Sequence, residues 1–274
     1  MIHERVYLYE NNDRVYLDTY VTNTELDRPR RAILVFPGGG YGFCWWGEGE
    51  PVARQLLTSN FCAFVLNYSV KPDTLRPDGT PSPLIDASKA MAYIKRNAEK
   101  FRIDPDKIAV IGFSAGSHLA GTLGTMWHYD FVREAAEIEY GENKPGAMIL
   151  SYPVLSSDPE IAHKGSFNNL LTGGTGEAPQ DKMDFYSVEK QVSDKTCPTF
   201  MWHTAPDGVK VENTLAMALA LSEHKIPFEV HIFPEGPHGL SIATREIKPD
   251  DGDYLEYVGR WVDYAKAWLD VVMP

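Results

Sequence analysis

The chain has 274 residues, 43% of them hydrophobic and 23% charged, which is the composition of a globular protein with an ample core. Its formal net charge of -12 at pH 7 argues against nucleic acid and anionic membrane surfaces as partners, because both require clustered Lys and Arg. The first residues lack the apolar stretch of a secretory signal, and no apolar run is long enough to span a bilayer, so we expect a cytoplasmic protein. Its three cysteines show no metal-site spacing and are expected to be reduced.

The N-terminal segment predicts a β-hairpin at the edge of a sheet. RVYLYE (5–10) and RVYLDTYV (14–21) alternate apolar and polar residues, and the polar NND between them predicts the turn. Six short, nearly continuous apolar runs follow, which is typical of parallel strands covered on both faces. They are RAILVF (31–36), CAFVLNY (62–68), KIAVIGF (107–113), AMILSYPV (147–154), TFMWHTA (199–205) and FEVHIF (228–233).

Helical segments alternate with these strands. Apolar residues at three- and four-residue steps predict helices over 83–100, 116–127, 211–224 and 255–271. We therefore predict a single α/β domain over 1–274, with a mostly parallel doubly wound sheet, an antiparallel N-terminal hairpin and helices on both faces. The Pro-rich stretch 71–83 is expected to be a surface loop, and 155–197 a small cap-like excursion above the sheet edge.

A serine flanked by glycines follows the strand 107–113. Gly112-Phe113-Ser114-Ala115-Gly116 fits the G-x-S-x-G pattern, in which a tight strand-to-helix turn exposes the serine oxygen. Three fixed positions also occur by chance, and a turn serine that caps a helix is the alternative. The predicted strand before the motif and the predicted helix after it favour a nucleophile.

A serine nucleophile needs a base, and His238 is the best candidate among eight histidines. It lies in FPEGPHGL, directly after the strand 228–233 and therefore at the same carboxyl edge of the sheet as Ser114. His203 and His231 fall inside apolar strands, where hydrogen-bonded core histidines are more common. His163 has no chemical context that singles it out.

Asp207 is the candidate for the third group, which orients the base. It follows the strand 199–205 in Pro206-Asp207-Gly208, one α/β repeat before His238, so the chain topology brings both to one edge. A plain turn aspartate is the alternative for this residue alone.

A glycine run, Gly38-Gly39-Gly40, ends the strand 31–36. Its unobstructed amides predict an oxyanion hole made by Gly39 or Gly40 together with Ala115, the residue after the nucleophile. A phosphate-binding loop is the rival interpretation, but G-x-G-x-x-G would require glycine where Phe43 stands.

The segments FPGGGYGF, LNYSVKP, IAVIGFSAGSHLAG, WHTAPDGVKVEN and FPEGPHGL together resemble the α/β-hydrolase superfamily. More narrowly, they are similar to the bacterial acetyl-xylan-esterase-like, or lipase/esterase-like, group. The resemblance implies a triad of Ser114, Asp207 and His238 in the chain order of that superfamily. Pro37 replaces the histidine that often precedes the glycines, and DGVKV is shorter than the usual acid loop, so Glu212 is the alternative acid.

We therefore expect a serine esterase that hydrolyses short acyl esters, acetyl esters above all, of sugars or small alcohols, with no metal or organic cofactor. Tyr41 and Trp45 are expected to wall the substrate pocket, although aromatic rings packed under the loop are an equal alternative. The acetyl-sugar preference is implied mainly by the resemblance. An amidase or peptidase of the prolyl-oligopeptidase kind and a catalytically inactive binding protein are the other hypotheses. The sequence leaves open whether the chain forms a homo-oligomer.

Overall fold

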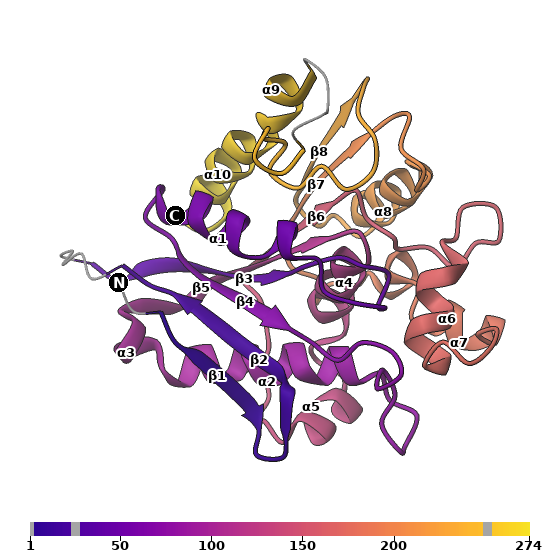
Figure 1. Cartoon of the computed structure of the whole chain (residues 1–274), viewed down its shortest axis with the longest axis horizontal. Coiled ribbons are helices and arrows are strands. Elements are labelled where there is room, and N and C mark those ends of the chain that lie inside the picture. The colour runs from indigo at the N-terminus through magenta and orange to yellow at the C-terminus, as the bar shows by residue number, and fades with distance from the viewer. Residues whose placement is uncertain (1–2, 23–27, 249–253) are drawn as a thin grey trace.

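The computed structural model describes residues 3–22, 28–248 and 254–274, and within them eight strands form one sheet (Figure 1). The spatial order is β1-β2-β4-β3-β5-β6-β7-β8. Strand β2 pairs antiparallel with β1 and with β4, and all the other neighbours are parallel. The predicted mostly parallel sheet with an antiparallel N-terminal hairpin is thus confirmed. The strands are β1 (Arg5–Tyr9), β2 (Asn12–Tyr20), β3 (Arg30–Phe36), β4 (Cys62–Asn67), β5 (Ile103–Phe113), β6 (Ala147–Ser151), β7 (Thr199–Thr204) and β8 (Phe228–Phe233).

The central strands are apolar on both faces because each face is covered by helices. Leu34 and Phe36 of β3 belong to a core that includes residues of α2, α4 and α8. Ile33 and Val35, on the opposite face, belong to a second core with residues of α1 and α10. Those helices are α1 (Glu50–Leu57), α2 (Ser82–Arg96), α4 (Ala115–Met126), α8 (Glu212–Glu223) and α10 (Trp261–Val272). The doubly covered sheet predicted from continuous apolar runs is therefore present.

Several predicted boundaries were wrong for local reasons. Tyr9 pairs with Asn12, so the hairpin turn is Glu10-Asn11 and not residues 11–13. Strand β6 ends at Ser151 rather than at residue 154, because Tyr152 takes a φ of 37° that no strand accommodates.

The long helices predicted at 83–100 and 255–271 are both interrupted. The first ends at Arg96, where the Asn97 side chain donates a hydrogen bond to the carbonyl of Tyr93 at 2.8 Å, and α3 (Ala98–Phe101) follows. The second is divided into α9 (Tyr254–Gly259) and α10.

The two irregular stretches differ in content. Residues 71–81 form a non-helical loop before α2 begins at Ser82, as predicted. Residues 155–197 contain α6 (Lys164–Thr172), α7 (Gln180–Phe185) and η2 (Val188–Gln191), and α6 and α7 lie on the side of the molecule toward which β4 points (Figure 1). Among the described residues, η1 (Trp46–Glu48), α1 and α5 (Asp130–Ala136) are also absent from the prediction. In the part of the chain described, no helix has the length and apolar character that crossing a bilayer requires.

Candidate active site

Ser114 lies at the sharp turn between β5 and α4 in a strained conformation. Its φ of 52° and ψ of -118° lie outside the regions that L-residues favour. A Cβ added to Gly112 would lie 2.1 Å from the carbonyl oxygen of Gly116, and one added to Gly116 would lie 2.1 Å from that of Phe36. Both glycines are therefore required by close backbone approach, of strand to helix and of helix to the end of β3.

Ser114, His238 and Asp207 form one hydrogen-bonded chain. The Ser114 hydroxyl lies 2.8 Å from Nε2 of His238, and Nδ1 of His238 lies 2.9 and 3.0 Å from the two carboxylate oxygens of Asp207. The three residues come from the ends of β5, β7 and β8, as the sheet topology implies. This geometry lets the imidazole accept the serine proton while the carboxylate fixes the ring.

The Asp207 carboxylate is held in its charged form although its side chain is only 1% exposed. Burial acts to raise its pKa, but hydrogen bonds from His203 and His238 outweigh burial and lower the pKa to about 2. The Val209 amide also donates to this carboxylate, at 2.7 Å. The alternative acid, Glu212, is exposed at the start of α8, and it is Asp207 that contacts His238.

Backbone N–H groups suited to an oxyanion line the same site. Gly39 and Gly40 line the pocket with Ser114 and have φ values of 129° and 62°, which glycine adopts readily. Among the described residues none accepts a hydrogen bond from the N–H of Gly39 or Gly40, whereas the Gly38 N–H donates to Glu48 at 2.6 Å. The Ala115 N–H opens α4, where the first amides have no acceptor within the helix.

A buried carboxylate that the sequence analysis missed supports this arrangement. Glu48 is 2% exposed, accepts the Gly38 N–H at one oxygen and accepts the Tyr152 hydroxyl at the other, each at 2.6 Å. The same hydroxyl accepts the Ser241 N–H at 2.8 Å, and the Tyr152 ring meets the His238 ring edge-on at 5.0 Å. Burial raises the pKa of Glu48. Glu48 and Tyr152 thus join the glycine loop to the loop that carries the histidine.

The pocket at Ser114 has a volume of about 360 Å³ and a mixed lining. Phe43, Trp45 and Val209 supply apolar surface, while His163 and Lys248 supply nitrogen atoms. Trp45 therefore lines this pocket, and its contact with substrate stays a prediction.

Tyr41 does not line the pocket, contrary to the expectation. It is 1% exposed, and its hydroxyl is hydrogen-bonded to Nδ1 of His118 at 2.8 Å beneath the loop. The Tyr41 ring is therefore packed under the loop, which was the alternative to a place in the pocket wall. A φ of 59° at Tyr41, which alternation along the sequence does not reveal, turns its side chain inward.

His163 was passed over in the sequence analysis, yet it lines the pocket beside Ser114 and His238. Its Nδ1 lies 2.8 Å from the Ser166 hydroxyl, at the start of α6. Burial lowers its pKa. Only the fold of residues 155–197 brings it there, so no local signal marks it. Across the described ranges, no group of three or more His, Cys, Asp and Glu side chains has a metal-binding arrangement.

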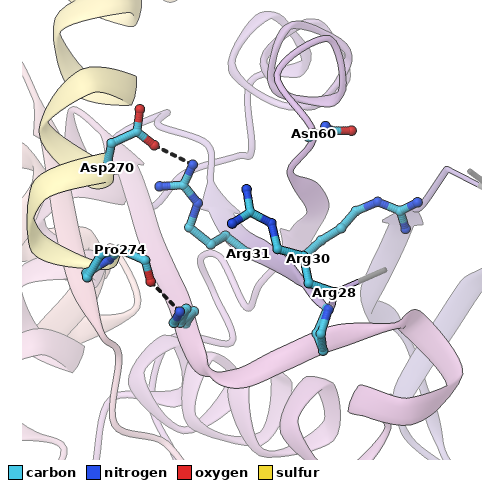
Figure 2. A pocket seen from close by; sticks show the side chains of 8 residues that line it. Arg28, Arg30, Arg31, Asn60, Asp270 and Pro274 are labelled. Atoms are coloured by element: carbon cyan, nitrogen blue, oxygen red, sulfur yellow. Dashed lines mark hydrogen bonds and ion pairs between the residues drawn. The ribbon is translucent and has the colours of Figure 1, made fainter. Parts of the chain in front are cut away.

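A second pocket, of about 230 Å³, lies at the opposite ends of the strands (Figure 2). Arg30 and Arg31 begin β3, and Asn60 precedes β4. The Arg31 guanidinium is paired with Asp270 of α10 at 2.5 Å, and Lys107 donates to the main-chain oxygen of Pro274. This basic pocket is separate from the residues around Ser114.

The model of the BD-FAE family matches residues 17–221. Endo-1,4-beta-xylanase B of Butyrivibrio fibrisolvens is 40% identical over 84% of this chain and 35% of its own length, and the acetylxylan esterase of Xylanibacter ruminicola is 28% identical over 86% and 46%. The chain thus spans less than half the length of these two relatives. The crystal structure of an acetyl ester-xyloside bifunctional hydrolase from Caldicellulosiruptor lactoaceticus is similar with a TM-score of 0.81 and 36% identity, covering 98% of this chain and 96% of that one.

The sheet order, the turn at Ser114 and these matches agree with one another and with the resemblance seen in the sequence. The chain is an α/β hydrolase and belongs to the BD-FAE family.

Proposed function

We propose that this protein is a serine esterase that removes short acyl groups, acetyl above all, from sugars or small alcohols. The observation that carries the proposal is the hydrogen-bonded chain from Ser114 through His238 to Asp207, which opens onto a pocket beside Gly39 and Gly40. The names of the relatives, an acetylxylan esterase and an acetyl ester-xyloside hydrolase among them, support the substrate class.

The reaction has two acyl transfers. Ser114 attacks the ester carbonyl while His238 takes its proton, and the N–H groups of Ala115 and of Gly39 or Gly40 receive the charge that develops on the carbonyl oxygen. His238 then gives the proton to the departing alcohol, leaving an acyl-serine. Water, deprotonated by the same histidine, attacks this intermediate and releases the carboxylic acid. Asp207 stabilises the imidazolium in both steps.

The pocket lining supports a small acyl group next to a sugar ring. Phe43 and Trp45 offer apolar faces on which the C–H side of a sugar can pack, and His163 offers a hydrogen-bonding nitrogen close to Ser114. A long acyl chain would need a continuous apolar tunnel, and Lys248 and Glu48 interrupt the apolar lining.

The test is a panel of p-nitrophenyl esters, from acetate to octanoate, measured with the wild type and with Ser114→Ala. We expect acetate to be the best substrate, and Ser114→Ala to lose about 10⁴-fold or more in kcat. A fluorophosphonate should label the wild type and leave Ser114→Ala unlabelled. Faster turnover of the octanoate would contradict the short-chain preference, and preferred cleavage of an aminoacyl anilide would indicate an amidase.

A further inference from the structure

A groove lies next to the catalytic pocket. Of the predicted site residues, Trp45 is the one that lines it. Its floor is formed by alternate residues of β2, among them Tyr16 and Asp18, and by Asn67 of β4, which pairs with Tyr16. Its wall is formed by Trp45 and Trp46 just before α1. The cavity has a volume of about 220 Å³, and we call it the hairpin groove.

The hairpin groove adjoins the catalytic pocket at Trp45, which lines both. The ring of Trp46 lies 6.2 Å from that of Trp45 at an angle of 61°, so aromatic surface extends from the vicinity of Ser114 into the groove. Lys248 lies over the Trp45 ring at 5.4 Å, on the side of the catalytic pocket. A ligand that occupies both would therefore pass along Trp45.

Trp46 contacts the Trp45 ring but is largely exposed. Its side chain is 65% exposed although tryptophan is usually among the more buried residues, and it stands at the rim of a groove rather than over a core. Large exposed aromatic surface at the edge of a concavity is typical of ligand contact.

Polar groups beside this aromatic surface favour a neutral, hydroxyl-rich ligand. Asp18 accepts two hydrogen bonds from Arg5, at 2.8 and 2.9 Å, and retains further acceptor capacity. Asn67 donates to the carbonyl of Arg14 at 2.6 Å, and the Glu50 carboxylate is 63% exposed. Each carboxylate is paired with an arginine, Asp18 with Arg5 and Glu50 with Arg54, so neither leaves a net charge that would select an ion. The lining also includes the apolar Pro37, Val65 and Leu66, and a sugar ring can use apolar and aromatic faces together with polar acceptors.

We propose that the hairpin groove is a second sugar-binding subsite, which holds a neighbouring ring of an oligosaccharide whose acylated sugar lies at Ser114. This proposal rests on the proposed esterase function and adds that the substrate is a chain of sugars rather than a monosaccharide. Trp46 supplies the stacking face, while oxygen atoms of Asp18, Glu50 and Asn67 accept hydrogen bonds from the sugar hydroxyl groups.

The experiment compares three substrates: p-nitrophenyl acetate, acetylated xylose and acetylated xylotetraose. In the wild type we expect kcat/KM to be about tenfold higher for the tetraose than for the monosaccharide, the size expected of one aromatic contact. Trp46→Ala should abolish this gain and leave p-nitrophenyl acetate turnover within twofold of the wild type. Tyr140→Ala is the matched control, because Tyr140 is 63% exposed and lines neither the catalytic pocket nor the groove.

Binding gives a second measurement that does not depend on turnover. Isothermal titration calorimetry of the Ser114→Ala variant with unacetylated xylotetraose should detect binding. The Ser114→Ala/Trp46→Ala double variant should lose this binding. No gain with chain length in the wild type, or a gain that survives Trp46→Ala, would overturn the subsite while the esterase proposal stood. Absence of hydrolysis of all three substrates would instead overturn the proposed function.

Discussion

The Asp207 and Glu48 carboxylates at the carboxyl ends of the parallel strands and the Arg31–Asp270 pair at the amino ends stand in different settings. At the carboxyl ends, the Asp207 side chain and Glu48 are 1% and 2% exposed, and each accepts hydrogen bonds from N–H or O–H groups of other loops. At the amino ends, Arg31 is 25% and Asp270 64% exposed, and the two side chains pair with each other across the basic pocket (Figure 2).

This difference decides what each group contributes. Water competes for an exposed ion pair, so the pair contributes little to stability and its loss is tolerated. A buried carboxylate has no water to replace a lost partner, so removing one hydrogen bond disturbs every group that shares the network. Charge alone therefore does not distinguish the end of the sheet that carries the candidate active site, whereas buried carboxylates that share hydrogen bonds between loops do.

The largest effect is expected at Asp207. Replacing it with Asn leaves the shape of the side chain but favours the wrong His238 tautomer, so kcat should fall about 10⁴-fold. Steady-state hydrolysis of p-nitrophenyl acetate measures the loss, and circular dichroism checks that the variant is folded. Asp263→Asn, at a side chain that is 80% exposed, is the control. A comparable loss in Glu212→Gln, with Asp207→Asn nearly active, would make Glu212 the acid.

Glu48 should give the next largest effect, although it touches neither the serine nor the histidine. Glu48→Gln turns an amide N–H toward a donor, either the Gly38 N–H or the Tyr152 hydroxyl, and so loosens the loop that carries the proposed oxyanion donors. We expect kcat to fall about 100-fold, with a small change in KM, because the lost interactions act on the transition state.

Two companions separate positioning by Glu48 from loss of folding. Tyr152→Phe removes one of the same hydrogen bonds and should lower kcat in the same direction, while Glu223→Gln, at an exposed position, should leave it unchanged. A normal kcat in Glu48→Gln would contradict the positioning role of the Glu48 carboxylate.

The buried His118 should make the stability of the protein depend on pH. It is buried between the Tyr41 hydroxyl and the Tyr186 carbonyl, each at 2.8 Å, and burial lowers its pKa to about 4. Because the unfolded chain takes up this proton near pH 6.5 and the folded chain does not, stability falls as the pH decreases from 6.5 toward 4. By pH 5 the loss should reach about 2 kcal/mol.

Urea unfolding of His118→Gln tests this expectation, since glutamine can donate to one partner and accept from the other without titrating. The difference in unfolding free energy between pH 7 and pH 5 should be about 2 kcal/mol smaller in this variant than in the wild type. His224→Gln, at an exposed histidine, should behave as the wild type. An equal change in unfolding free energy between pH 7 and pH 5 in all three proteins would mean that His118 is not buried in a neutral form.

The sheet was predictable because its signals are local. Continuous apolar runs marked each parallel strand, and the polar residue after each run marked the carboxyl edge where Ser114, Asp207 and His238 meet. Short elements such as α1 and α6 were not predicted. Each has few apolar positions, and these form a recognisable pattern only when the surface that they pack against is known.

The rest of the site depends on tertiary contacts that a single sequence does not display. In the sequence, Glu48 is one of several acidic residues. It is a buried acceptor only because the fold brings Gly38 and Tyr152 to it. His163 reaches the pocket through the fold of residues 155–197. Tyr41 and Trp45 have similar sequence settings, yet a positive φ sends Tyr41 inward while Trp45 faces the pocket.

The smallest effect is expected at the amino ends of the strands. Arg31→Ala removes the pair with Asp270 and the contact of the guanidinium with the Phe61 ring, whose centroid lies 4.7 Å away. Because the partner carboxylate is well exposed, we expect the free energy of unfolding to fall by about 1 kcal/mol or less, and kcat/KM for p-nitrophenyl acetate to stay unchanged. Because salt screens an exposed ion pair, the difference in unfolding free energy between variant and wild type should be smaller in high salt than in low salt. A loss of activity would show that the basic pocket acts on the site at the opposite edge of the sheet, and would break the separation between the two ends.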